Sequence, residues 1–219
     1  MPTTSSVIPD ALLLMTSACP HCPAVLQSLS TLLKAGKIGQ LEAINLSLRP
    51  EAAANYGART VPWVRIGSFD LEGLRSQGEL QHWAEASGTV KGMAEYFSDL
   101  LKSGASNKAL SALAEDNARF EALLYLLIRS DTNLHMRLGV GAVMEDLQGS
   151  DTLRRNVDRL AALTRHPDAR IRGDACHYLS LTHIPHALPA VRALLDDTDA
   201  EVRETARDSL AVLEDTTKN

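Results

Sequence analysis

The sequence is poor in aromatic residues, has few cysteines and contains no long apolar run. Aromatic side chains make up 4% of the chain, although 45% of its residues are hydrophobic. A core must therefore be built mostly from Leu, Ala, Val and Ile, a set that suits helices. The 219 residues are enough for one large domain or two small ones.

Neither sign of charge dominates the chain. The formal net charge is −5, and acidic and basic residues are mixed along the sequence. No basic patch or tail stands out that would attract phosphates or an anionic lipid surface. We therefore expect neither nucleic acid nor a membrane among the partners.

The N-terminal residues do not resemble a targeting segment. No Lys or Arg precedes the apolar run Ala11–Met15, and this run is too short for a signal peptide or a membrane span. Three cysteines, two of them in one motif, also do not match a secreted disulfide framework. We expect a cytoplasmic protein, in a compartment where thiols stay reduced.

The strongest motif is the tetrad Cys19-Pro20-His21-Cys22, followed 40 positions later by Val61-Pro62. Two cysteines separated by two residues can close into a disulfide and reopen. In an intracellular protein, near a β-α-β pattern, this spacing is typical of a thioredoxin-like redox site.

Residues 7 to 88 alternate strand and helix patterns. Short apolar runs bounded by turn residues predict strands, and apolar spacings of three and four predict helices. The predicted order is β-α-β-α-β-β-α, over residues 11–16, 20–34, 41–46, 51–57, 63–66, 69–71 and 80–85. Gly67-Ser68 is expected to turn the last two strands into a hairpin.

Residues 89 to 219 carry helical patterns only. Met93, Phe97, Leu100 and Leu101 form one stripe that ends at Gly104, and a longer helix is predicted from Leu110 to Ile128. Further helices are predicted over 153–164 and 187–195. The chain is thus divided into a first domain over 1–88, a linking helix over 89–107 and an α-solenoid over 108–219.

A repeat supports the solenoid. Asp168-Ala-Arg-Ile-Arg172 recurs 31 residues later as Asp199-Ala-Glu-Val-Arg203, and a weaker copy begins at Asp131. This turn, followed by a small residue, resembles the HEAT-repeat family over roughly residues 105 to 213. The resemblance implies a stack of helical pairs that binds a partner protein. We expect Arg172 and Arg203 to bond the aspartate of the neighbouring turn.

Chemistry at the dithiol follows from its predicted place at a helix start. There the free N–H groups and the helix dipole favour an anion, which lowers the pKa of the Cys19 thiol. Pro20 suits the first helical position, and a protonated His21 would add positive charge. Cys22, one turn further, would be the less exposed resolving thiol.

The segments Cys19-Pro-His-Cys-Pro-Ala-Val25 and Tyr56-Gly-Ala-Arg-Thr-Val-Pro-Trp63 resemble glutaredoxin-like domains of protein disulfide oxidoreductases. They are especially similar to the N-terminal dithiol domain of the alkyl hydroperoxide reductase flavoprotein. This resemblance covers residues 7 to 88 and implies an α/β thioredoxin-like fold. It makes Cys19 the attacking thiol, Cys22 the resolving thiol and Pro62 a cis-proline. The Val61 backbone would then pair with an extended substrate.

One residue departs from these families, because Trp63 stands where they usually carry Thr. The indole would either cover the dithiol or form a stacking wall for a substrate. No flavin-binding glycine motif follows the first domain, so the chain is not the whole reductase flavoprotein. The redox-active disulfide itself is the only expected cofactor, with a thiol or flavoprotein as electron donor. A zinc site at the tetrad would need two further ligands, and none lies at close spacing.

The expected compartment, the cytosol, favours reduction of substrate disulfides over their formation. The tetrad is also that of the DsbA oxidants, whose potential lies about 150 mV above that of thioredoxin. In a reducing cytosol such a potential would keep the dithiol reduced, so a reductase or exchange role fits better. A measured potential above about −180 mV would contradict the reductase role.

A metal site in the second half of the chain is disfavoured. Four potential ligands are close in sequence, namely Cys176, His177, His183 and His186. Cys176 is expected to be a small buried hydrophobe, and His183 and His186 are expected to be loop residues.

Two functions remain open. The first function is a thiol–disulfide oxidoreductase whose solenoid binds the protein substrate. The alternative is a redox-sensing adaptor whose dithiol switches partner preference with little or no turnover.

Overall fold

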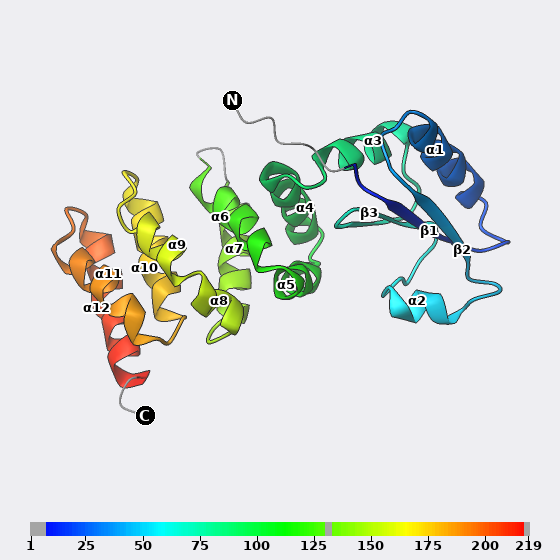
Figure 1. Cartoon of the computed structure of the whole chain (residues 1–219). Helices are drawn as coiled ribbons and strands as arrows, with labels where there is room; N and C mark the ends of the chain where they lie inside the picture. Colours follow the sequence, from blue (N-terminus) through cyan, green and yellow to red (C-terminus); the bar gives the residue numbers. More distant parts are fainter. Residues whose placement is uncertain (1–7, 130–132, 217–219) are drawn as a thin grey trace. The chain divides into compact units, whose positions relative to one another are not determined.

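The computed structural model describes residues 8–129 and 133–216 of the chain. The chain divides into two compact units between Tyr96 and Phe97, within helix α4 (Val90–Lys102; Figure 1), and each unit is described by itself. This boundary falls within the segment 89–107 that was expected to be a linking helix. The first unit contains a small mixed sheet with helices, and the second contains helices only in its described part.

A four-stranded sheet with the order β2-β1-β3-β4 forms the first unit. The strands are β1 (Ala11–Met15), β2 (Leu41–Asn45), β3 (Trp63–Ile66) and β4 (Phe69–Glu72). β1 is parallel to β2 and antiparallel to β3, and β3 is antiparallel to β4. Gly67, whose φ is +55°, makes the tight β3–β4 turn, a conformation that glycine adopts without steric cost.

Helices cover both faces of this sheet (Figure 1). They are α1 (Cys22–Lys34), α2 (Glu51–Asn55) and α3 (Gln77–Ala86). α3 packs over β4, where the rings of Trp83 and Phe69 lie 4.9 Å apart, and α1 contacts both α3 and β1. On the other face, Ala52 of α2 joins a core cluster with Leu12, Leu14, Ile44 and Trp63. The element order over residues 11–86 is therefore the one that was predicted.

In the second unit, three pairs of helices that follow one another in the sequence pack together. Contacts join α6 with α7, α9 with α10 and α11 with α12, and α10 packs on α12. The helices are α5 (Ser106–Glu115), α6 (Phe120–Ile128), α7 (Leu134–Asp146), α8 (Asp151–Arg155), α9 (Val157–Leu163), α10 (Ala169–Ser180), α11 (Leu188–Ala193) and α12 (Ala200–Thr216), with single 3-10 turns at 117–119, 185–187 and 194–196. Stacked pairs bury the apolar face that one pair alone would leave exposed.

The 31-residue repeat is reproduced in the hydrogen bonds at the starts of α10 and α12. Asp168 Oδ1 accepts the Arg170 N–H at 2.9 Å, and Asp199 Oδ1 accepts the Glu201 N–H at 2.9 Å. Each aspartate thereby satisfies a backbone donor that the first helical turn leaves free. The weaker copy was placed at Asp131, which lies outside the described residues.

Two segments that were each predicted as one helix form two helices in the structure. The helix expected from Leu110 to Ile128 is divided into α5 and α6, and Asp116 accepts the Ala118 N–H at 2.9 Å at the break. The helix expected over 153–164 is divided into α8 and α9 at Asn156, which is 1% exposed. The Asn156 side chain donates to Thr152 O at 2.8 Å and to Asn117 Oδ1 at 2.7 Å. A tertiary hydrogen bond therefore holds this break in place.

Candidate functional sites

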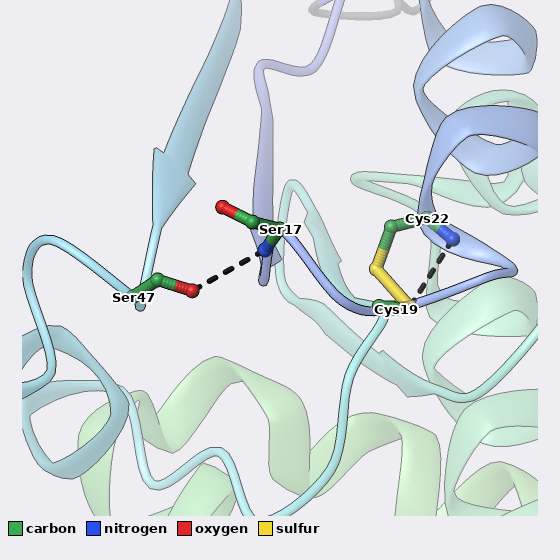
Figure 2. The surroundings of a disulfide bond; sticks show 4 residues. All are labelled: Ser17, Cys19, Cys22 and Ser47. Atoms are coloured by element: carbon green, nitrogen blue, oxygen red, sulfur yellow. Dashed lines mark hydrogen bonds between the residues drawn. A yellow bond between two sulfur atoms is a disulfide. The ribbon is translucent and has the colours of Figure 1, made fainter.

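Cys19 and Cys22 form a disulfide at the start of α1 (Figure 2). Their Cα atoms lie 5.5 Å apart, within the usual range for a disulfide. Cys19 belongs to the loop that leaves β1, and its N–H donates to Thr16 O at 3.3 Å. Cys22 is the first residue of the helix, so the disulfide joins the β1 loop to the helix start.

The two sulfur-bearing side chains differ in exposure, as predicted. Cys22 is fully buried at 0%, whereas Cys19 is partly exposed. The Cys22 N–H donates to Cys19 Sγ at 3.2 Å. This N–H is one of the donors that the first helical turn leaves without a backbone acceptor, and it would stabilise a thiolate on Cys19. An incoming group can therefore reach Cys19 more readily than Cys22.

The position predicted for Pro20 is wrong. The helix begins at Cys22 rather than at Pro20, and the proline of its first turn is Pro23. A proline there costs no hydrogen bond because the N–H that it lacks would have had no intrahelical acceptor. Pro20 and His21 both lie in the exposed segment before the helix, and the His21 side chain makes no capping bond.

Sequence reasoning missed a set of polar contacts that fixes the β1 loop. The Ser17 N–H donates to Ser47 Oγ at 3.3 Å (Figure 2). Asn45 Nδ2 donates to Ser17 Oγ at 3.0 Å. The Ser47 N–H in turn donates to Asn45 Oδ1 at 2.9 Å. The Asn45-x-Ser47 spacing is the sequence signal for that local turn. These bonds tie the loop that carries Cys19 to the end of β2.

Val61-Pro62 is a cis peptide bond, as predicted. Pro62 is buried and Val61 is partly exposed, and the Gly73 N–H donates to Pro62 O at 2.9 Å. Trp63 pairs with Leu14 across two antiparallel strands. Pro62 therefore lies at the end of the sheet where β1 passes into the loop that carries Cys19.

The prediction that Trp63 contacts substrate is corrected by its burial. The residue is only 1% exposed and packs with Leu12, Leu14 and Ile44 in the core cluster. Its ring centroid lies 5.9 Å from that of Tyr56. The alternation of β3 turns the indole toward the face covered by α2, so it cannot form a stacking wall in this structure.

The helical unit carries a groove of about 870 Å³ between α7, α10 and α12. Its lining includes the small side chains Gly173, Ser180, Thr205 and Ser209, which let a bound chain approach closely. Carboxylates also line it, and among the described residues neither Glu201 nor Asp208 has an ion-pair partner. Arg137 and Arg170 line the groove as well, so positive charge is favoured only near Glu201 and Asp208.

An ion pair crosses one wall of this groove. Arg137 Nη2 of α7 lies 3.2 and 3.0 Å from the two carboxylate oxygens of Asp174 on α10. The Nε atom of Arg137 is buried and has no partner among the described residues. Sequence analysis did not single out this pair, because α7 and α10 are distant in the chain.

Cys176 is a buried core residue, as predicted. It is 0% exposed, and burial raises the pKa of its thiol to about 11. His183 lies 2.9 Å from the Gln148 amide, and His186 lies 2.8 Å from Asp158. Within 8–129 and 133–216, no three His, Cys, Asp or Glu side chains are grouped as metal ligands would be.

Comparison with known families gives one match. A family model for HEAT repeats matches residues 120–211, which begin at α6 and end inside α12. No curated protein matches the chain. The helical unit is therefore similar to HEAT repeats, which typically mediate protein interactions, and the match does not include the sheet or the dithiol.

A membrane span is not found in the part of the chain that the structure describes. No helix there combines the length and the apolar character that crossing a bilayer requires.

Proposed function

We propose that the protein is a thiol–disulfide oxidoreductase that acts on protein disulfides through Cys19 and Cys22. The observation that carries the proposal is the pair itself, with a partly exposed Cys19 whose sulfur accepts the N–H of a buried Cys22. The element order, the mixed sheet and the cis Val61-Pro62 bond support the resemblance to thioredoxin- and glutaredoxin-like domains.

The reaction consists of two thiol–disulfide exchanges. The Cys19 thiolate attacks one sulfur of the substrate disulfide, forms a mixed disulfide and releases the other sulfur as a thiolate. The Cys22 thiolate then attacks Cys19 Sγ, releases the second substrate thiolate and closes the Cys19–Cys22 disulfide. Two electrons have passed to the substrate, and a thiol or flavoprotein donor must return them. Reduction is the favoured direction if the protein works in the cytosol.

The helical unit would select the protein substrate. Its groove between α7, α10 and α12 is large enough for an extended peptide, and its unpaired Glu201 and Asp208 favour basic residues in that peptide. This assignment rests on the similarity to HEAT repeats and on the charges of the lining, whereas the chemistry rests on the dithiol. Separate elements would thus supply specificity and reaction.

Turnover of a protein disulfide tests the proposal. Reduction of insulin by dithiothreitol or glutathione should be accelerated by the protein, and Cys19→Ser or Cys22→Ser should remove the acceleration. Cys176→Ser is the matched control, because this thiol is buried and outside the site. Equal rates for the native protein and the Cys19→Ser variant would refute the enzymatic role.

The alternative is a redox-sensing adaptor, favoured by the similarity of the helical unit to HEAT repeats in a chain that also carries the Cys19–Cys22 disulfide. In that case insulin reduction would show no acceleration, while binding of a partner would change when Cys19 and Cys22 are oxidised. Insulin reduction by the native protein distinguishes the two functions, because the adaptor requires the disulfide but not its turnover. In the adaptor, Cys19→Ser should instead abolish the effect of oxidation on partner binding.

A further inference from the structure

One flank of α12 repeats a flank of α10 that is covered by the following helices. On α10, Arg172, Cys176 and Leu179 share this flank, and Cys176 and Leu179 are each 0% exposed. The positions 31 residues later on α12 are Arg203, Arg207 and Leu210. Arg207 is exposed, and Arg203 and Leu210 are partly exposed. The surface that is buried on α10 is thus accessible on α12.

Arg172 shows what the covered flank binds. Its Nη1 donates to the carbonyl oxygens of His166 and Pro167, both at 3.0 Å. Its Nε and Nη2 donate to the two oxygens of Asp197, each at 2.7 Å. This is a two-pronged arginine–carboxylate pair, the strongest form of side-chain ion pair. It joins one helical repeat to the turn that opens the next.

Arg203 makes half of the same set of bonds. Its Nη1 donates to the carbonyl oxygens of Asp197 and Thr198 at 2.7 and 3.1 Å, which are the positions 31 residues after His166 and Pro167. Arg203 thus bonds an aspartate of the neighbouring turn, as expected, but through the backbone carbonyl of Asp197 and not through its carboxylate. No carboxylate within residues 8–129 and 133–216 pairs with its Nε and Nη2. The guanidinium is therefore held in the orientation that binds a carboxylate in the preceding repeat.

We propose that the flank formed by Arg203, Arg207 and Leu210 binds a carboxylate-bearing segment of an acidic partner protein. Arg203 supplies the two-pronged site, Arg207 a second positive charge one turn later, and Leu210 an apolar contact. Among the described residues no carboxylate forms an ion pair with either arginine, although Arg203 is close enough to Asp197 to help the hydrogen bond from Arg172 lower the pKa of that carboxyl. The chain as a whole carries a net charge of −5. This surface is distinct from the groove, which is lined by other residues of α12, among them Val202, Thr205 and Asp208.

A second copy of the chain fits the flank less well than an acidic partner does. In a second copy stacked on this flank, Arg203 would need a carboxylate equivalent to Asp197, which binds Arg172. The residue equivalent to Asp197 in the preceding repeat is His166, 31 residues earlier, and it offers no carboxylate. Arg207 also replaces the buried Cys176, and a charged side chain disfavours the apolar packing by which identical repeats stack. Charge complementarity thus selects the partner.

Binding of fluorescein-labelled poly-L-aspartate to the full-length protein tests the proposal. Fluorescence anisotropy at low ionic strength should show binding that weakens as salt is added. Arg203→Gln should weaken binding at least about tenfold, equivalent to about 1.4 kcal/mol. Arg203→Lys should be intermediate, because lysine keeps the charge but lacks the fork.

Two further variants keep the test decisive. Arg207→Gln alters an exposed side chain and should also weaken binding, so a loss of stability in Arg203→Gln does not leave the result open. Arg155→Gln, an exposed arginine on α8, is the charge-matched control and should bind as the native protein does. No binding by the native protein, or equal losses for Arg155→Gln and Arg207→Gln, would overturn the proposal. Insulin reduction should be unchanged in all of these variants, which separates this surface from the dithiol.

Discussion

We expect the thiols of Cys19 and Cys176 to differ in reactivity, because their surroundings differ. Cys19 is partly exposed beside a helix N–H, whereas Cys176 is fully buried and burial raises the pKa of its thiol to about 11. At pH 8 only about one Cys176 side chain in a thousand would carry the thiolate that reacts.

We therefore expect iodoacetamide to modify Cys19 first in the reduced native protein at pH 8. Cys176 should remain unmodified until the protein is unfolded in urea, which removes both the burial and the raised pKa. Peptide mapping by mass spectrometry measures the order of modification. Modification of Cys176 at a rate close to that of Cys19 would contradict the structure.

The sequence was enough to place the reactive residues but not their neighbours. The pairing of Cys19 with Cys22 could be predicted from the spacing of the motif, and the cis bond before Pro62 from the resemblance to glutaredoxin-like domains. Trp63 could not be placed, because whether an indole faces solvent or core depends on strand alternation and on which helix covers that face. The contacts of Ser17 with Asn45 and Ser47 depend on strand pairing that joins distant residues.

Elements were predicted best where one apolar stripe coincided with one helix or strand. β3 was predicted over its observed residues, and α4 carries the predicted stripe of Met93, Phe97 and Leu100. The breaks at Asp116 and Asn156 escaped prediction because the apolar periodicity continues across them. A side-chain bond from Asn156 to Asn117 sets one break, and periodicity alone carries no information about such a bond.

The link between α10 and the turn before α12 makes a prediction about stability. Arg172 and Asp197 have side-chain exposures of only 13% and 7%. Asp197→Asn would leave the guanidinium charge without its partner and should lower the free energy of unfolding by about 3 kcal/mol. Urea unfolding at pH 7 measures this change. Asp158→Asn, which removes a carboxylate that is 86% exposed, is the control and should have little effect.

The effect of Asp197→Asn should also depend on pH. The hydrogen bond from Arg172 holds the pKa of Asp197 below its ordinary value of 3.8. The stabilisation is therefore fully present above about pH 4 and is lost as the pH falls through the lower folded-state pKa. The native protein and the variant should converge in stability in acid. A difference that stays constant down to the lowest pH at which both fold would argue against this ion pair.

At the scale of the whole molecule, the chain combines two kinds of organisation. The core of the first unit is built around a small mixed sheet. In the second unit, helices pack in pairs and α10 of one pair packs on α12 of the next. The strand patterns of the sequence end before residue 88, which indicated two kinds of organisation, whereas the division itself falls between Tyr96 and Phe97, inside α4. The interactions that the helical unit offers were less predictable, because its groove and its arginine flank are formed by residues from separate repeats.

The central claim is that Cys19 attacks a substrate disulfide and Cys22 resolves the product, and intact-protein mass spectrometry of Cys22→Ser tests it most directly. After incubation with a small symmetrical peptide disulfide, this variant should carry one peptide half on Cys19, and dithiothreitol should release it. The native protein should hold no adduct because Cys22 displaces it, and Cys19→Ser should form none. An unmodified Cys22→Ser variant, or an adduct on Cys176 instead of Cys19, would contradict the claim.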